Sequence, residues 1–248
     1  MTLKTALRTN MRGTDNALIL NNLIKEQSLG AGAYVIVVDF SKAFDRCHIA
    51  TLLKKLSRKN VKGKLLRLIK DLYTGSEAQL FINGKAGSAF EVTRGVAQGC
   101  VLSPLFFDVY LDDLLSTFRQ RGLGVPIGQV IHGASSFADD LALVAPDKHT
   151  AEAYLSILEK RCEENFFKVN SDKSGILRVG ELRSQPDPNF SLKGERIRLL
   201  EEEDPIHKDV ERFKYLGFMI SLKEEMGRFR QSKNSTLQTS TWTILALF

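Results

Sequence analysis

Two adjacent carboxylates, Asp139 and Asp140, interrupt an apolar stretch at residues 135–145. Short apolar arms on both sides of a tight polar turn predict a β-hairpin with these acids where the chain reverses. Neighbouring like charges cost free energy unless a cation binds between them, and a divalent metal is the obvious candidate. The pair alone does not distinguish a metal site from an ordinary turn, because turns favour Asp for backbone reasons. A second pair, Asp112 and Asp113, lies in a predicted helix.

The composition allows a folded chain with a polyanionic partner. The 248 residues are 43% hydrophobic, enough for the core of one large domain or of a domain with a small appendage. The net charge is +6, and the basic residues gather between positions 46 and 70, where no acid occurs. Such a block is typical of phosphate binding, although a solvated helix face gives the same pattern.

Three cysteines, Cys47, Cys100 and Cys162, are an odd number without close spacing, which argues against a disulfide framework or a zinc site. The first ten residues lack the apolar segment of a signal peptide, and no apolar run reaches the length of a membrane span. We therefore expect an intracellular protein, nuclear or cytoplasmic, that is not secreted and has no membrane partner.

Residues 34–38 form a continuous β-branched run that predicts a strand buried on both faces, and this strand ends in Asp39. A carboxylate at the end of a buried strand is expensive to desolvate without a partner. A helix-capping role is more plausible for Asp45 than for Asp39. Asp39 is therefore a candidate site residue.

The remaining pattern alternates helices and strands. We expect helices at 14–29, 45–60, 62–72, 104–121 and 150–166, with Thr150 as a cap, and strands at 77–82, 89–93, 175–179 and 213–220, the last with a glycine interruption. Asn83-Gly84 predicts a hairpin turn, and residues 170–173 a polar turn. A loop with two glycines, residues 94–104, leads into the helix that starts at Pro104, an arrangement that suits close approach of a phosphate.

Five motifs in this order resemble the reverse transcriptase domain of non-LTR (LINE-type) retrotransposons. Residues 38–45 read Val-Asp-Phe-Ser-Lys-Ala-Phe-Asp, and residues 94–104 match an Arg-Gly-Val-Pro-Gln-Gly-Ser-x-Leu-Ser-Pro loop except at Ala97 and Cys100. Residues 137–140 read Phe-Ala-Asp-Asp, 170–173 match Asn-x-x-Lys, and 215–217 read Tyr-Leu-Gly. A group II intron or telomerase-like enzyme is the alternative, and residues 42–45 suit the retrotransposon group better.

The resemblance implies an α+β fold, a polymerase palm in which helices back an antiparallel sheet, with partial fingers. Residues 1–33 would be a remnant of the fingers, residues 34–221 the palm with inserted fingers elements, and residues 222–248 a truncated C-terminal tail. The implied activity is RNA-directed DNA polymerisation, nucleotidyl transfer from a deoxynucleoside triphosphate to a primer 3′-hydroxyl. The partners would be an RNA template and a DNA primer, and the oligomeric state is left open.

By resemblance, Asp39 and Asp139 would be the main ligands of two Mg²⁺ ions about 3.5 to 4 Å apart, with Mn²⁺ as a possible substitute. Asp140 would lie beside them, and the Phe40 carbonyl would complete one metal site. The other implied site residues fall into three groups. Gln98, Gly99, Phe44 and Lys173 would contact the nucleotide, Phe44 as a gate against a ribose 2′-hydroxyl; Tyr215, Leu216 and Gly217 would form the primer grip; and Lys54, Lys55, Arg58, Lys59, Lys62 and Lys64 would bind nucleic-acid backbone.

A second hypothesis competes with the enzyme. Because most of the fingers and the thumb have no match in this sequence, the chain could be a truncated, inactive retroelement product that at most binds nucleic acid. Intact Asp39, Asp139 and Asp140 favour the polymerase. We expect the chain by itself to bind template-primer and to extend it poorly.

Overall fold

The computed structural model describes residues 13–97, 99–137, 139–200, 212–215 and 218–221. Its centre is a four-stranded antiparallel sheet with the strand order β6-β7-β1-β8. These strands are β1 (Ala33–Asp39), β6 (Ala134–Phe137), β7 (Asp140–Ala145) and β8 (Gly175–Val179). In β1 every residue before Asp39 is buried, as its unbroken apolar run predicts.

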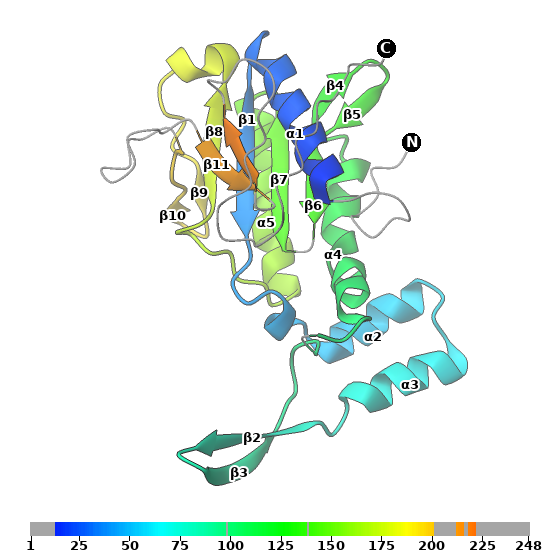
Figure 1. Cartoon of the computed structure of the whole chain (residues 1–248). Helices are drawn as coiled ribbons and strands as arrows, with labels where there is room; N and C mark the ends of the chain where they lie inside the picture. Colours follow the sequence, from blue (N-terminus) through cyan, green and yellow to red (C-terminus); the bar gives the residue numbers. More distant parts are fainter. Residues whose placement is uncertain (1–12, 98, 138, 201–211, 216–217, 222–248) are drawn as a thin grey trace, which may run out of the picture.

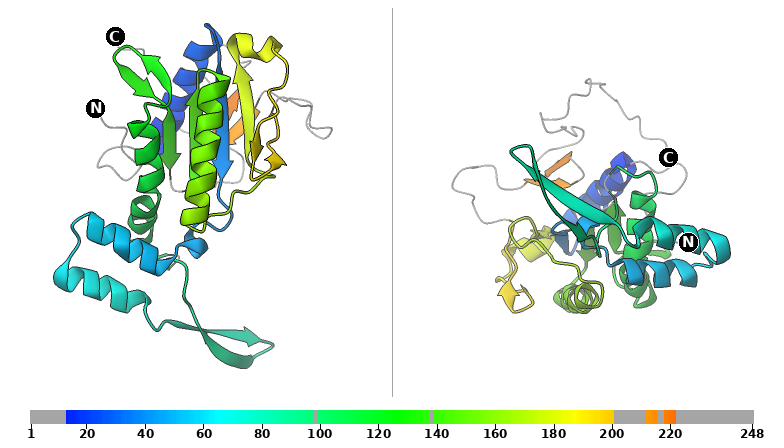
Figure 2. Two further views of the ribbon diagram at one scale, coloured as in Figure 1. Left: turned by 180° about the vertical axis from the view of Figure 1, so that it is seen from behind. Right: turned by 90° about the horizontal axis from the view of Figure 1, so that it is seen from below.

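Helices cover both faces of the sheet, and this explains why β1 is apolar at successive positions (Figures 1 and 2). Tyr34, Ile36 and Val38 belong to the core shared with α4 (Ser103–Gln120) and α5 (Lys148–Glu164). The alternate residues of β1 pack with α1 (Gly13–Ser28) on the opposite face. The arrangement confirms the predicted α+β class with helices backing an antiparallel sheet.

An arm extends from the end of the sheet at which β1 finishes (Figure 1). It consists of the 3₁₀ turn η1 (Phe44–Arg46), α2 (Ile49–Arg58), α3 (Gly63–Tyr73) and the hairpin of β2 (Glu77–Ile82) and β3 (Lys85–Glu91). Asn83 and Gly84 both have positive φ, 51° and 76°, which confirms the predicted turn. Only residues 40–43 separate the end of β1 at Asp39 from the start of the arm at Phe44.

Shorter elements complete the fold. They are β4 (Val125–Ile127), β5 (Val130–His132), η2 (Gly180–Ser184), β9 (Ser191–Leu192), β10 (Glu195–Arg196), β11 (Arg212–Tyr215) and β12 (Phe218–Ser221). Among the described helices, none is both long and apolar enough to cross a membrane.

Three expectations about these elements are corrected. The predicted helix over 45–60 is a 3₁₀ turn followed by α2, which begins only at Ile49. The cap of α5 is Asp147, whose side chain accepts a hydrogen bond from the Thr150 amide at 2.7 Å, so that Thr150 is inside the helix. The single strand predicted over 213–220 is a hairpin, because Tyr215 pairs with Phe218; Leu216 and Gly217 lie outside the described residues.

Candidate active site

Asp39, the last residue of β1, lies directly opposite Asp140, the first residue of β7. The backbone of Asp39 bonds to the 170–174 segment and not to β7. Its amide donates to Ser174 Oγ at 3.0 Å, and its carbonyl accepts from the Asn170 amide at 2.8 Å. Asp39 and Asp140 therefore form a non-hydrogen-bonded cross-strand pair, in which Cα atoms are typically about 4.5 Å apart. Both side chains emerge on the same face of the sheet.

Asp139 lies in the reversal between β6 and β7. Phe137 pairs with Asp140, so only residues 138 and 139 connect the strands, and Ala138 lies outside the described residues. The predicted hairpin is thereby confirmed, with one acid in the turn and one in the first position of β7. Asp39, Asp139 and Asp140 are all partly buried at one end of the sheet.

The polar turn at residues 170–173 forms as predicted and lies against Asp39. Asn170 Nδ2 donates to Asp39 Oδ2 at 3.2 Å, and the Lys173 and Ser174 amides donate to the Asn170 carbonyl at 3.3 and 2.9 Å. The motif drew attention to Asn170 and Lys173 but gave no sign of Ser174, which is separated from Asp39 by 135 positions. Lys173 itself is exposed.

The ring and the backbone carbonyl of Phe40 have different surroundings. The ring stacks on Phe167 with 4.9 Å between centroids. The bridge between Phe40 and Val169 uses the carbonyl of Asp39 and the amide of Ser41, so the two residues beside Phe40 bond toward the β8 side. Successive carbonyls of an extended chain point to opposite sides, which turns the Phe40 carbonyl toward the β7 side.

Phe44 lies where the glycine loop contacts the arm. Its half-buried ring stacks on Phe107 at 4.9 Å, and its carbonyl accepts from the Val96 amide at 3.0 Å. Gly95 has a φ of 97°, and a Cβ there would lie 3.2 Å from the Asp45 backbone, so the loop reaches η1 only with glycine. Gly99 is exposed, whereas Gln98 lies outside the described residues.

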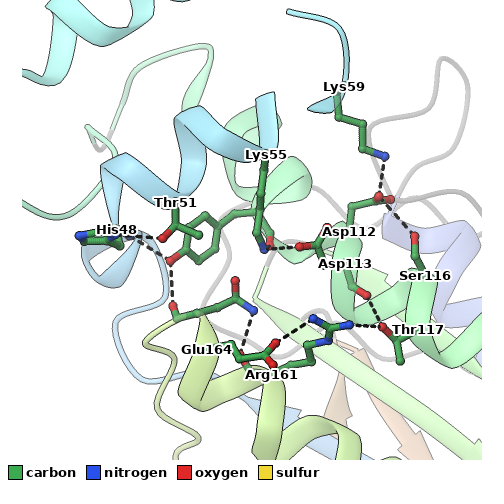
Figure 3. A network of polar contacts seen from close by, with 12 residues as sticks. His48, Thr51, Lys55, Lys59, Asp112, Asp113, Ser116, Thr117, Arg161 and Glu164 are labelled. Atoms are coloured by element: carbon green, nitrogen blue, oxygen red, sulfur yellow. Dashed lines mark hydrogen bonds and ion pairs between the residues drawn. The ribbon is translucent and has the colours of Figure 1, made fainter. Parts of the chain in front are cut away.

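The expectation for Lys55 is corrected, because this side chain is buried and points toward Asp113 (Figure 3). Lys55 is 4% exposed, and its Nζ donates to the Tyr110 carbonyl at 2.5 Å and lies 3.2 Å from Asp113 Oδ2. Burial lowers the pKa of Lys55, and the Asp113 carboxylate opposes that shift. Lys59 is exposed, yet it pairs with Asp112 at 2.5 Å. The rest of the predicted backbone-binding set is exposed: Lys54, Arg58, Lys62 and Lys64.

Tyr110 connects the start of α2 with the end of α5 beneath the same network. Its hydroxyl accepts from the His48 amide at 3.1 Å and donates to the Asn165 carbonyl at 2.8 Å. Burial raises the pKa of Tyr110 to about 12, which keeps the hydroxyl a donor near neutral pH. Together with Lys55, this residue fixes the base of the arm on α4.

Tyr215 is also placed by the structure. It is 1% exposed, and its hydroxyl donates to Ser135 Oγ on β6 at 3.2 Å. Burial raises the pKa of Tyr215. Its side chain therefore supports the strand that leads into the Asp139 turn, whereas a primer grip would require groups that reach a nucleic acid.

The donor atoms suit a hard divalent cation. Carboxylate oxygens and a backbone carbonyl are ligands that Mg²⁺ accepts, and the Asp39 and Asp140 side chains share one face of the sheet. Within the described part of the chain, no three His, Cys, Asp or Glu side chains are already gathered closely enough to hold a metal. The residues thus fit the ion in the type of their donor atoms, and two of the carboxylates share the face on which it would bind.

Comparison with known proteins gives one family and a consistent set of relatives. The family described as "Reverse transcriptase (RNA-dependent DNA polymerase)" matches residues 3–220. The Pol polyprotein of the R2DM element of Drosophila melanogaster is 29% identical over 205 residues, which are 82% of this chain and 19% of the relative. The RNA-directed DNA polymerase of the mobile element jockey from the same species is 24% identical over 89% of this chain and 23% of its own length. The expected resemblance to non-LTR retrotransposon reverse transcriptases is confirmed.

Solved telomerase structures share the fold. Apo telomerase from Candida tropicalis has a TM-score of 0.57 at 12% identity and covers 88% of this chain and 36% of its own. Telomerase from Candida albicans, in complex with a fragment of telomeric RNA, has a TM-score of 0.54 at 14% identity over 83% of this chain and 34% of its own. The chain spans about a fifth of the R2DM protein and about a third of these telomerases.

Proposed function

The chain belongs to the reverse transcriptase family, and from this premise we propose that it supplies the catalytic palm of an RNA-directed DNA polymerase. The observation that carries the proposal is the placement of Asp39 opposite Asp140, with Asp139 in the adjoining turn. These acids come from two parts of the sequence about 100 positions apart, and the fold brings them to the same end of the sheet. Like charges at neighbouring positions cost free energy unless a cation binds between them, which supports a metal-binding role.

We assign Asp39, Asp139 and Asp140 as the carboxylates that hold two Mg²⁺ ions, with the Phe40 carbonyl as a further ligand. When bound, such a pair of ions activates the primer 3′-hydroxyl and neutralises charge on the triphosphate. The chain's own task is to present the oxygens from a fixed frame. Both backbone groups of Asp39 are held by hydrogen bonds with the 170–174 segment, at Asn170 and Ser174, which supports this role.

The nucleotide would bind between the metal site and the base of the arm. Phe44 and the glycine loop are in contact there, which supports placing the sugar against the Phe44 ring and the phosphates near Gln98 and Gly99. Lys173 is exposed three residues after Asn170, within reach of solvent-borne anions beside Asp39. We keep residues 215–217 as the proposed primer grip. Because the Tyr215 side chain is buried, the backbone of this segment would contact the primer.

The template-primer would lie along the arm. The exposed cations Lys54, Arg58, Lys62 and Lys64 offer a basic surface without base-specific geometry, which suits phosphate contacts. The Candida albicans telomerase, which shares the fold, was solved with RNA. We propose an intracellular site of action, nuclear or cytoplasmic, where RNA and deoxynucleotides meet.

Nucleotide incorporation by the full chain tests this function. Oligo(dT) annealed to poly(rA) is offered with dTTP and either Mg²⁺ or Mn²⁺, with the protein in excess of the primer. We expect metal-dependent addition of dT by the wild type and none by Asp39→Asn, whose fold is checked by circular dichroism. Tight binding of the duplex without any addition would instead favour a catalytically inactive, nucleic-acid-binding product.

A further inference from the structure

The Asn170 side chain contacts the carboxylate of Asp39 from the side opposite β7. Its Nδ2 lies 3.2 Å from Asp39 Oδ2, and the amide nitrogen rather than the amide oxygen must face the carboxylate because only the nitrogen donates. Asn170 is partly buried, and 131 positions separate it from Asp39. The contact therefore depends entirely on the fold.

The bond constrains one of the two Asp39 oxygens. A carboxylate on a single strand position can rotate about its terminal torsion, which is broad. With Oδ2 held by Asn170, the orientation of Oδ1 is also set. An uncharged amide donor fixes this orientation while leaving the negative charge of Asp39 uncancelled, as a cation-binding carboxylate requires.

The Asn170 backbone is held independently of its side chain. Its amide donates to the Asp39 carbonyl at 2.8 Å, and its carbonyl accepts from the Lys173 and Ser174 amides at 3.3 and 2.9 Å. Ser174 in turn accepts from the Asp39 amide through Oγ at 3.0 Å. Removal of the Asn170 side-chain amide thus deletes one hydrogen bond and leaves the turn closed by its backbone.

We propose that Asn170 is a positioning residue for the Asp39 carboxylate, orienting it to receive a divalent cation. The inference rests on the proposed metal-dependent function and adds a residue that acts on the metal site through Asp39. Groups that hydrogen-bond to metal-ligating carboxylates commonly change metal affinity about 10-fold or more when they are removed. Loss of the Asn170 amide should therefore weaken cation binding without unfolding the chain.

The test measures Mn²⁺ binding by the electron paramagnetic resonance signal of the free ion, in the full 248-residue chain. Asn170→Ala is compared with wild type, with Asp39→Ala and with Asn165→Ala. Asn165 is the matched control, since its side chain donates to the Arg161 carbonyl at 2.9 Å on the same connection. We expect the dissociation constant of Mn²⁺ to rise about 10-fold in Asn170→Ala, to stay at the wild-type value in Asn165→Ala, and binding to be lost in Asp39→Ala.

A second measurement, nuclear magnetic resonance in the absence of metal, follows the hydrogen bond from Asn170 to Asp39. In ¹⁵N-labelled protein the side-chain amide resonances of Asn170 should move in Asp39→Ala, because the donor loses its partner. Mn²⁺ uptake that depends on Asp39 and is unchanged in Asn170→Ala would overturn the positioning role alone. Absence of Mn²⁺ uptake by the wild type would overturn the metal assignment of the proposed function and the positioning role with it.

Discussion

Lys55 of α2 and Asp113 of α4 form an ion pair in which Nζ lies 3.2 Å from Oδ2 and the lysine side chain is 5% exposed. The same Nζ donates to the Tyr110 carbonyl and lies 4.7 Å from the centre of the Tyr110 ring. A buried charge is tolerated only with such compensation. The pair therefore fixes α2 of the arm on α4.

Truncation of Lys55 should be costly, whereas truncation of its neighbour Lys54 should not. Lys55→Ala leaves Asp113 without its cation and should lower the free energy of unfolding by about 3 kcal/mol, the lower end for buried pairs because the Asp113 side chain is 31% exposed. Lys54→Ala should change it by less than about 0.5 kcal/mol. Urea unfolding measures both, and equal losses would contradict the buried pair.

The exposed cations of the arm should set the salt dependence of nucleic-acid binding. Simultaneous substitution of Lys54, Arg58, Lys62 and Lys64 by Ala should weaken duplex binding and reduce the slope of log K against log salt by up to about 3, since each phosphate contact contributes roughly 0.7–0.9. Lys148→Ala, at an exposed cation on α5, is the control. Fluorescence anisotropy over a salt series makes the measurement, and an unchanged slope would exclude the arm from the binding surface.

Phe44 should discriminate between sugars. If its ring lies against the nucleotide sugar, Phe44→Ala removes the clash with a 2′-hydroxyl and raises incorporation of ribonucleotide relative to deoxyribonucleotide. The ring also stacks on Phe107, so the same change should cost stability by about 1–3 kcal/mol. Competition between UTP and dTTP on poly(rA) gives the ratio. Reduced stability with an unchanged ratio would leave Phe44 as a packing residue.

Asp108 should make stability depend on pH. Burial, and secondarily the Asp112 carboxylate, raises the pKa of Asp108 from 3.8 to about 6. The folded state then binds this proton more tightly than the unfolded state, so the contribution of Asp108 to stability falls as pH rises from 4 to 6 and stays low above that range.

The isosteric change Asp108→Asn removes this penalty. It should stabilise the chain at pH 7 by on the order of 1–3 kcal/mol and flatten the profile between pH 4 and 6. Asp112→Asn is the contrasting variant on the same helix, since Asp112 pairs with Lys59 and Arg119, and it should lower stability instead. Thermal unfolding across the pH range distinguishes the two, and a wild-type profile for Asp108→Asn would refute the raised pKa.

The sequence was most informative where a local pattern determines the structure. The β-branched run of β1, the acidic hairpin and the Asn83-Gly84 turn are each specified by neighbouring residues, and each formed as predicted. Because Asp39 ends one predicted strand and Asp140 begins another, the candidate site followed once the motifs were recognised together.

The features that the sequence did not predict depend on tertiary contacts. Lys55 was grouped with the solvent-facing cations of its block, although it is three residues after Leu52 and one before Leu56, the buried face of α2. That spacing was a usable sign of burial, but the partner, Asp113, could not be read from it. Likewise the hydrogen bonds from Asn170 and to Ser174 join segments more than 130 positions apart, which no local pattern encodes.

The most direct test of the central claim is single-turnover addition of dTTP to oligo(dT) on poly(rA), with the 248-residue chain in excess and divalent metal varied. We predict slow addition that requires Mg²⁺ or Mn²⁺ and is abolished in Asp39→Asn and Asp140→Asn, while both variants keep wild-type duplex binding. Addition that survives loss of Asp39, or wild-type binding without any addition, would contradict the assignment of this chain as a polymerase palm.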